Sequence, residues 1–407
     1  MAGSSSLLRA INVRAALAHL LERGRLTRGE LRDLTGLSKP TASEVIRQLQ
    51  DAGLAIVAGH TSGGPGPNAE IYAPEPNASF HAAFSVRDVG GRDEPNLLAA
   101  IADLTGTVRA RLATSIDFRT TTAVEALSTT LATLIADAGV PADRLDHVQL
   151  GVPGSYDPLT DVIRYVDVPG WSAPGLITRI RTELDVPVDV ENDVNLAAIA
   201  ERAHGIAADT SAFALLWLGS EGLGLATDLD GTLLRGARGG AGEIGYMPVG
   251  LPDPASTGRR RDFTDLVGGD AVLRLAADHG LVAASSPAAM RIAADGGHEP
   301  FLDELAERIA FGLAAVVAVL DPPLLVLAGE VGQAGGEALS TAVARAASTA
   351  SPLHCEIAPS GVSDDAVLLG ALRSGLTTTR ERLLDTASGA TGPMHDPTQA
   401  ARLLRST

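Results

Sequence analysis

The spacing of hydrophobic residues changes along this chain and divides it into a short head and a long body. Residues 12–22 place leucine and valine at helical spacing and end before Gly24, so they predict an amphipathic helix. Two shorter helical patterns follow, beginning after Thr27 and after Ser38. From about Ala82 onward, short apolar runs of strand length alternate with alanine-rich helical stretches, which is typical of α/β architecture.

The second and third helices of the head carry explicit start signals. The run from Thr27 to Glu30 has the form of a capping box, in which a hydroxyl and a carboxylate satisfy the free amides of a first turn. Ser38 can cap the third helix, and Pro40 fits its first turn because no amide is needed there. We expect this helix to run to about Asp51. Its inward-facing residues would be Val45, Ile46 and Leu49.

A pair of strands is expected after the third helix, at residues 54–58 and 70–72, around a loop rich in glycine and proline. This order of elements is that of a winged helix-turn-helix, whose recognition helix enters the major groove of DNA. The candidate DNA-binding residues on the polar face of that helix are Ser38, Lys39, Thr41, Ser43, Arg47 and Gln50. A three-helix packing module without a role on DNA is the alternative. The wing tip, residues 61–68, contains no arginine or lysine.

The net charge of −17 hides an asymmetry between head and body. Residues 1–60 contain eight basic and five acidic residues, 8 − 5 = +3, so the remaining 347 residues carry −17 − 3 = −20. A basic module on an acidic body is charged as expected of a DNA-binding domain fused to a domain that does not touch DNA. Chance clustering of arginines is the alternative explanation.

Composition excludes several classes of protein. With 45% hydrophobic and 3% aromatic residues, the chain can build real cores, mainly from alanine, leucine and valine. The single cysteine, Cys355, excludes a disulfide scaffold and a multi-cysteine zinc site. The longest apolar run, residues 309–320, is too short to cross a bilayer, and arginines interrupt the N-terminus where a secretory signal would be apolar. We therefore expect a cytoplasmic protein that does not contact a membrane.

Two stretches of the body share one pattern. Residues 99–108 predict a strand, a turn at Thr105-Gly106 and a second strand, and residues 224–233 repeat this unit. The repeat suggests two similar lobes, each with a sheet edged by a hairpin. Shared turn chemistry alone would give the same pattern, so both explanations stay open at this stage.

Polar residues gather at strand ends in the middle of the body. Residues 148–152 predict a buried strand that ends at Pro153-Gly154, and a helix at 176–184 leads to a second strand at 186–190. Asn192 and Asp193 follow that strand at the start of another helix, where α/β sheets bind ligands. A carboxylate beside an amide suits the hydroxyls of a sugar, and Asp193 could act as a general base. As simple helix caps, the two residues would need no ligand.

A second polar cluster lies in residues 236–245, which are too rich in glycine for regular structure. Glu243 is the only acidic residue of this run. The missing side chains would let the backbone pass very close to a ligand. A flexible surface loop is the alternative.

On these residues, the body resembles the ROK family (repressors, open reading frames and kinases), which has a two-lobed actin/hexokinase-like, or ribonuclease H-like, fold. The matching stretches, in order within residues 82–375, are Val152-Pro153-Gly154, Gly170-Trp171, Glu191-Asn192-Asp193, Ala241-Gly242-Glu243-Ile244-Gly245, and Asp321-Pro322 followed by Leu327-Ala328-Gly329. By this resemblance Asn192, Asp193 and Glu243 would hold sugar hydroxyls, with Gly154 beside them. Asp193 would occupy the position of the kinases' catalytic base. With its winged head, the whole chain resembles a ROK-type transcriptional regulator.

Departures from the family pattern argue against kinase activity. The kinases bind ATP with Asp-x-Gly-Gly-Thr, whereas residues 88–92 here read Asp-Val-Gly-Gly-Arg and are followed by Asp93 and Glu94. The threonine is missing, and two carboxylates stand where nucleotide phosphates would bind. The family's zinc site is also missing, since Tyr246 replaces its histidine and residues 247–270 contain no cysteine. We therefore expect no metal, no cofactor and no enzymatic activity.

The sequence thus predicts a winged helix-turn-helix domain at residues 1–76, two α/β lobes at 77–197 and 198–385, and a flexible tail at 386–407. The predicted function is a sugar-responsive regulator of carbohydrate metabolism, such as a repressor, that binds operator DNA. A homodimer or homotetramer is expected because palindromic operators need paired heads. Two alternatives stay open: an ATP-dependent sugar kinase with an accessory DNA-binding head, and a non-enzymatic scaffold whose pocket is vestigial.

Overall fold

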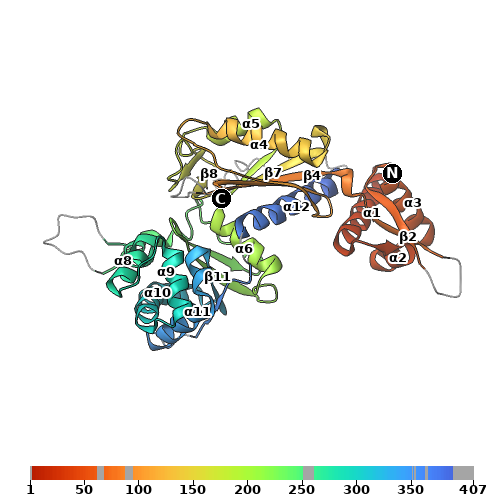
Figure 1. Cartoon of the computed structure of the whole chain (residues 1–407). Coiled ribbons are helices and arrows are strands. Elements are labelled where there is room, and N and C mark those ends of the chain that lie inside the picture. Colours follow the sequence, from red (N-terminus) through yellow and green to blue (C-terminus); the bar gives the residue numbers. More distant parts are fainter. Residues whose placement is uncertain are drawn as a thin grey trace, which may run out of the picture.

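A helical head lies at one end of the molecule, and two α/β lobes follow it (Figure 1). This computed structural model describes residues 2–61, 68–87, 95–250, 261–350, 352, 354–362 and 365–387. The head consists of α1 (Ala2–Arg23), β1 (Leu26–Thr27), α2 (Arg28–Thr35), α3 (Lys39–Asp51), β2 (Ala55–His60) and β3 (Glu70–Pro74). Strand β3 pairs antiparallel with β2 and with β1, so the elements follow the order expected of a winged helix-turn-helix.

The local signals of the head act as predicted. The capping box of α2 forms between Thr27 and Glu30, and the Ser38 hydroxyl accepts a hydrogen bond from the Thr41 amide at the start of α3. The predicted inward-facing residues of α3 are buried. The first helix begins earlier than expected, at Ala2. Residues 62–67 of the predicted wing tip lie outside the described residues.

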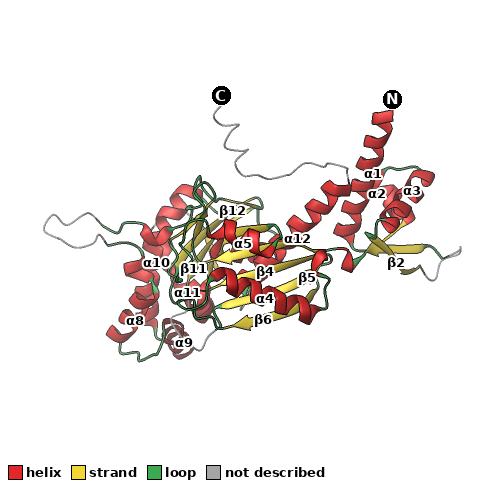
Figure 2. Cartoon of the chain, turned by 90° about the horizontal axis from the view of Figure 1, so that it is seen from above, coloured by secondary structure: helices red, strands yellow, loops and turns green. Residues whose placement is uncertain are grey.

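The first lobe is built on a five-stranded sheet with the order β10-β7-β4-β5-β6. Its strands are β4 (Phe80–Val86), β5 (Leu97–Asp103), β6 (Val108–Thr114), β7 (Leu145–Val152) and β10 (Val188–Asn192). Helices α4 (Ala123–Ala138) and α5 (Leu176–Leu184) cover one face (Figure 2). A small hairpin, β8 (Ser155–Asp157) and β9 (Val162–Arg164), follows β7. The strand predicted at 186–190 forms two residues later, because Pro187 has no amide to donate to a ladder.

The second lobe repeats this topology. Its sheet has the order β13-β12-β11-β14-β15, an antiparallel meander extended by two parallel strands as in the first lobe. The strands are β11 (Ala212–Leu218), β12 (Leu223–Leu229), β13 (Thr232–Leu233), β14 (Leu324–Ala328) and β15 (Glu356–Pro359). The helices outside this sheet are α7 (Thr264–Val267), α8 (Gly269–Asp278), α9 (Ser286–Gly296), α10 (Glu299–Leu320) and α11 (Gly329–Ala350). The predicted duplication is therefore confirmed at the level of the fold.

Turn chemistry also repeats between the lobes. Asp103 Oδ1 accepts the Thr105 amide at 2.9 Å, and Asp228 Oδ1 accepts the Gly231 amide at 2.8 Å. Both aspartates are buried and each pairs with an arginine. The sequence left two explanations open, duplicated lobes and shared turn chemistry. Both apply, because the equivalent hairpins of the two lobes have an aspartate that accepts a backbone amide of the turn.

Two helices lie between the sheets. Helix α6 (Asp193–His204) packs on the second sheet, and α12 (Ala366–Ala387) packs on α6 and on the first sheet. The division at residues 197/198 stays a prediction, but α12, which falls in the predicted second lobe, lies on the first sheet. The predicted tail begins inside α12, which ends at Ala387, and residues 388–407 lie outside the described part. No described helix is long and apolar enough to span a membrane.

Candidate functional site

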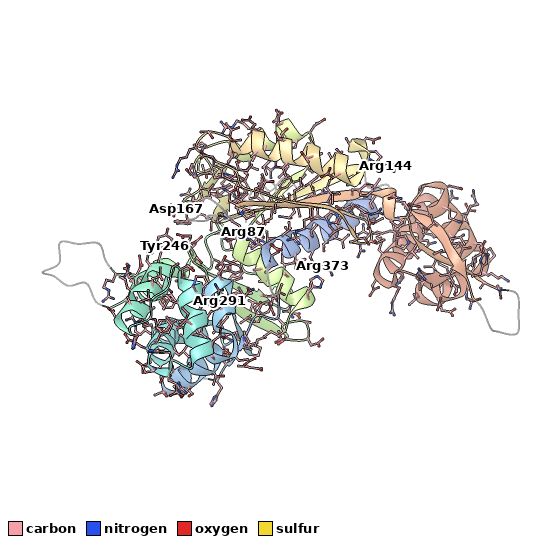
Figure 3. The ribbon with its side chains drawn as sticks, viewed as in Figure 1. Arg87, Arg144, Asp167, Tyr246, Arg291 and Arg373 are labelled. Atoms are coloured by element: carbon pink, nitrogen blue, oxygen red, sulfur yellow. The ribbon has the colours of Figure 1, made fainter. Side chains whose placement is uncertain are left out.

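A large cleft of about 1420 Å³ opens between the two lobes and is lined by residues of both. In Figure 3, Arg87 and Asp167 of the first lobe lie across from Tyr246 and Arg291 of the second. All four residues predicted to bind a sugar line this cleft: Gly154, Asn192, Asp193 and Glu243. The sequence prediction placed them in one site, and the structure brings them together there.

Strand order explains how the first three residues meet. Strands β7 and β10 are parallel neighbours, with Val152 opposite Asn192, so the segments that follow both strands emerge at the same sheet edge. Asn192 Oδ1 accepts the amides of Val194 and Asn195, and its Nδ2 donates to the Gly154 carbonyl at 3.1 Å. Asn192 therefore caps α6 and ties the two strand ends together, so the capping alternative holds for this residue.

Asp193 differs from Asn192 in its electrostatics. Its pKa is raised to about 7, first by burial and then by the negative charges of Glu243 and Glu330. One carboxylate oxygen, Oδ1, accepts the Val194 amide at 2.8 Å. Near neutral pH the group can therefore act as an acceptor or, when protonated, as a donor toward a hydroxyl.

Glu243 lies in the glycine-rich run, and both a hydrogen bond and close backbone packing fix its position. The Ser155 hydroxyl donates to Glu243 Oε1 at 2.6 Å, while burial raises the pKa of the Glu243 carboxyl. Gly242 has φ +91°, and a β-carbon there would lie 1.8 Å from the Leu225 carbonyl oxygen of β12. A β-carbon at Gly239 would lie 2.8 Å from the Tyr156 carbonyl oxygen. Close contact with the protein's own backbone explains these two glycines, rather than flexibility or approach to a ligand.

Gly154 has a similar structural reason. Its φ is +149°, and a β-carbon would lie 2.5 Å from the carbonyl oxygen of Arg164. The missing side chain lets the loop after β7 pack against the end of β9, where Tyr165 follows. Gly154 therefore shapes the cleft wall, and its carbonyl is already used by Asn192.

The cleft is strongly acidic. Among the described residues that line it, two are basic, Arg87 and Arg291. Eight are acidic: Asp167, Asp193, Glu221, Glu243, Asp262, Asp295, Glu330 and Asp365. Such a surface disfavours an anionic ligand and suits a neutral molecule with many hydroxyls.

Glu330 was not among the site residues predicted from the sequence. It follows β14 at the start of α11, and its Oε2 lies 3.4 Å from the Ser220 amide, which donates to it. Its effect on the Asp193 pKa places it in the same electrostatic site. A carboxylate directly after a strand end was the available signal. The altered nucleotide motif, residues 88–94, lies outside the described residues.

The residues present do not fit the zinc site that the resemblance would imply. Tyr246 offers a phenol in place of an imidazole, and Cys355 lies beside β15, outside the cleft lining. In the part of the chain that the structure describes, no group of three or more His, Cys, Asp or Glu residues could hold a metal ion.

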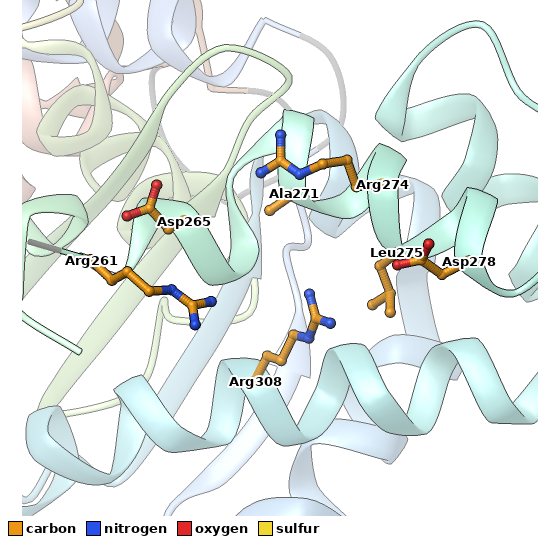
Figure 4. Close-up of a pocket in the computed structure, with 7 residues that line it drawn as sticks. All are labelled: Arg261, Asp265, Ala271, Arg274, Leu275, Asp278 and Arg308. Atoms are coloured by element: carbon orange, nitrogen blue, oxygen red, sulfur yellow. The ribbon is translucent and has the colours of Figure 1, made fainter. Parts of the chain in front are cut away.

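A second, smaller pocket of about 430 Å³ lies in the second lobe, against α8 and α10 (Figure 4). Its lining residues are Arg261, Asp265, Ala271, Arg274, Leu275, Asp278 and Arg308. The charges are mixed, and Arg308 already pairs with Glu304 at 2.7 Å. Because this pocket contains none of the predicted sugar-binding residues, we place the candidate ligand site in the interlobe cleft.

The candidate DNA-binding residues on α3 fall into two groups. The hydroxyls of Ser38 and Ser43 are used within the helix, by the Thr41 amide and the Lys39 carbonyl, and Thr41 is half-buried. Lys39, Arg47 and Gln50 are exposed, and so is Ser38, whose hydroxyl caps the helix. Arg47 pairs with Glu44 at 2.7 Å and with Asp51 at 2.9 Å, so these bonds must rearrange before it contacts a phosphate.

Comparison with known proteins adds to this geometry. Residues 88–374 match the ROK family. The chain is 27% identical over 207 residues to a glucokinase of Halalkalibacterium halodurans, covering 46% of this chain and 62% of that protein. It is 25% identical over 262 residues to the xylose repressor of Bacillus subtilis, covering 63% of this chain and 65% of that protein. The chain therefore spans somewhat less than two thirds of either relative.

A solved structure extends the likeness to the head. A ROK family transcriptional regulator, described as a homologue of the E. coli MLC protein, superposes with a TM-score of 0.70 at 18% identity. The match covers 94% of this chain and 99% of that one. This likeness confirms the predicted α/β fold of the body.

Proposed function

The chain belongs to the ROK family, and from this premise we propose that it is a sugar-responsive DNA-binding transcriptional regulator, of the repressor type, without kinase activity. The observation that carries the proposal is the course of α12. One end of this helix lines the cleft, and the other end packs into the core of the head.

The cleft end of α12 is anchored by charge. Ala366 and Val367 line the cleft, and Asp365 directly before them pairs with Arg87 at 3.1 Å and also with Arg111. Arg87 directly follows β4 and lines the same cleft. These ion pairs therefore hold the start of α12 against the first lobe, at the wall of the cleft.

The far end of α12 is part of the head. Leu383, Leu384 and Ala387 pack against the hydrophobic core formed by α1 and its neighbours, and Arg14 of α1 pairs with Asp385. Leu104, from the first lobe, is buried in the same core. The orientation of the head is thus tied to the body and to α12, as a ligand-controlled regulator requires.

The chemistry of the two ends supports the proposal. The acidic cleft with its carboxylate and amide groups suits a neutral sugar, while the exposed cationic and polar groups of α3 suit DNA. A ligand regulates only if it binds one lobe arrangement better than another. We propose that the sugar does so and that the protein acts as a homodimer or homotetramer, which presents paired heads to an operator.

Operator binding with and without sugar tests this function. Fluorescence anisotropy on DNA selected from a random pool should give tight binding that a carbohydrate from a monosaccharide and disaccharide panel changes. Asp193→Asn should lose the sugar response and keep DNA binding, because Asp193 lies in the cleft and not on α3. Loss of both activities in a folded Asp193→Asn protein, or no specific DNA binding by the wild type, would contradict the proposal.

One observation favours the second candidate function, a sugar kinase with an accessory head. The pKa of Asp193, near 7, is suited to a general base that takes a proton from a sugar hydroxyl. The sequence at residues 92–94 and the acidic cleft oppose ATP binding. Incubation with ATP, magnesium and glucose-type sugars decides between the regulator and the kinase. A kinase consumes ATP and the sugar, whereas a sensor consumes neither.

A further inference from the structure

Two tyrosine rings stand together at the cleft. The ring centroids of Tyr165 and Tyr246 are 5.2 Å apart, and the rings are inclined by 47°. They are 54% and 60% exposed, and both residues line the cleft. In a chain with only four tyrosines, two such rings side by side at the candidate ligand site are unlike the rest of the surface.

The segments that position the sugar-binding residues also position these rings. Tyr246 ends the short 3-10 helix η3 (Ile244–Tyr246), and its amide donates to the Glu243 carbonyl at 3.2 Å. Tyr165 follows β9, and its carbonyl oxygen would lie 3.3 Å from a β-carbon at Gly154. The backbones of Tyr246 and Tyr165 are therefore held next to Glu243 and Gly154.

The backbone of Tyr165 is strained. Its φ of +58° lies in the left-handed region, which a bulky side chain rarely adopts. Such strain costs about 1–3 kcal/mol and persists where the surroundings or a function require it. The Tyr165 side chain is exposed, so burial of the ring in a core does not offset this cost.

The cleft also has room beyond one sugar ring. Its volume of about 1420 Å³ exceeds the range of about 300–1,000 Å³ usual for small-molecule pockets. The carboxyl groups of Asp193 and Glu243 can supply polar contacts for a first ring. The C–H faces of a second pyranose ring are apolar, and an aromatic ring offers them a flat surface with a polar tip.

We propose that Tyr165 and Tyr246 form an aromatic platform that stacks on a second sugar ring, so that the effector is a disaccharide or longer saccharide. This inference rests on the proposed sugar-sensing function. Asp167, exposed in the same cleft and at the same end as Tyr246 in Figure 3, can accept hydrogen bonds from the hydroxyls of that ring.

Calorimetry with matched sugar pairs tests the platform: glucose with cellobiose and maltose, xylose with xylobiose, and galactose with lactose. The wild type should bind one disaccharide at least about tenfold more tightly than its monosaccharide. Tyr246→Ala and Tyr165→Asn should remove most of that advantage and leave monosaccharide binding within about twofold. Asparagine is chosen at 165 because it tolerates the left-handed backbone.

Two control variants separate stacking from other effects. Tyr246→Phe keeps the ring face and should retain the disaccharide preference. Leu159→Ala removes an exposed apolar side chain outside the cleft lining and should change nothing. Thermal unfolding of each variant, followed by fluorescence of Trp171 and Trp217, shows whether it is folded.

The failures are distinguishable. Monosaccharide binding that is as tight as disaccharide binding, and unaffected by both tyrosine variants, overturns the platform and leaves the sugar-sensing function standing. A folded wild-type protein that gives no heat with any sugar of the panel overturns both. Loss of monosaccharide and disaccharide binding together in folded Tyr246→Ala would assign the tyrosine to the first ring and also overturn the proposal.

Discussion

The raised pKa of Asp193 makes a quantitative prediction about stability. In the unfolded chain this carboxyl ionises with its ordinary pKa of 3.8, whereas in the folded protein its pKa is about 7. Below pH 3.8 the group is protonated in both states. Between these values the unfolded state releases a proton that the folded state keeps, so the free energy of unfolding falls as pH rises. Above pH 7 the full penalty for burying the charge is present.

The magnitude follows from the two pKa values. Their difference, multiplied by 1.36 kcal/mol per pH unit, gives about 4 kcal/mol. Asp193→Asn abolishes this titration and can keep the contact of its side-chain oxygen with the Val194 amide. The variant should therefore become more stable than the wild type as pH rises, by up to about 4 kcal/mol relative to their difference at pH 4.

Urea unfolding of both proteins between pH 4 and 8 measures this difference. Trp171 in the core of the first lobe and Trp217 at the cleft report on the body. Titrating groups that do not interact with Asp193 affect both proteins alike and cancel. Asp167→Asn, at an exposed carboxylate of the same cleft, is the matched control and should follow the wild type. A difference between wild type and Asp193→Asn that does not change with pH would refute the reasoning.

Three further changes test the supports of the cleft and of the head. Gly242→Ala should destabilise the body by more than about 1 kcal/mol and weaken sugar binding, because its β-carbon would overlap the Leu225 carbonyl; unchanged urea unfolding would contradict this. Ser38→Ala should cost about 1 kcal/mol of head stability by removing the cap of α3, and Ser38→Asn should restore it in thermal unfolding. Arg47→Ala should weaken operator binding and reduce its salt slope by about one, whereas Glu44→Gln should strengthen binding by removing one of the two carboxylates that pair with Arg47. Equal salt slopes in all three proteins would show that α3 does not lie on phosphates.

Features that depend on neighbouring residues were predictable from the sequence. The caps at Thr27 and Ser38 and the turn at Thr105-Gly106 rest on side chains that bond to nearby backbone. The helix at 176–184 has no side-chain cap and rests on the spacing of its buried apolar residues. The strand predicted at 186–190 was displaced because periodicity alone does not locate the effect of Pro187. Asn192 follows a predicted strand and precedes a predicted helix, so the sequence alone indicated both a helix cap and a residue at a sheet edge.

Features that depend on tertiary contacts were not predictable. The sequence around Glu330 does not show that its charge raises the pKa of Asp193, because the two residues follow strands of different sheets. The close packing of α12 on α6 depends on Gly370, where a β-carbon would lie 1.8 Å from the Leu196 carbonyl oxygen. The pairing of Tyr165 with Tyr246 joins two loops about 80 residues apart. Only the folded chain brings such groups together.

The contact between α6 and α12 gives the proposed regulator a physical route from sugar to DNA. Asn192 and Asp193 form the start of α6, so a ligand bound to them acts on that helix. Because Gly370 lets the backbones of α6 and α12 touch, a displacement of α6 cannot be absorbed by side-chain rearrangement at that point. At 1.5 Å per residue, the 22 residues of α12 extend about 33 Å, from the cleft to the core of the head. A movement of the lobes that a kinase would use to enclose ATP can thus reorient the attached head without any phosphate transfer.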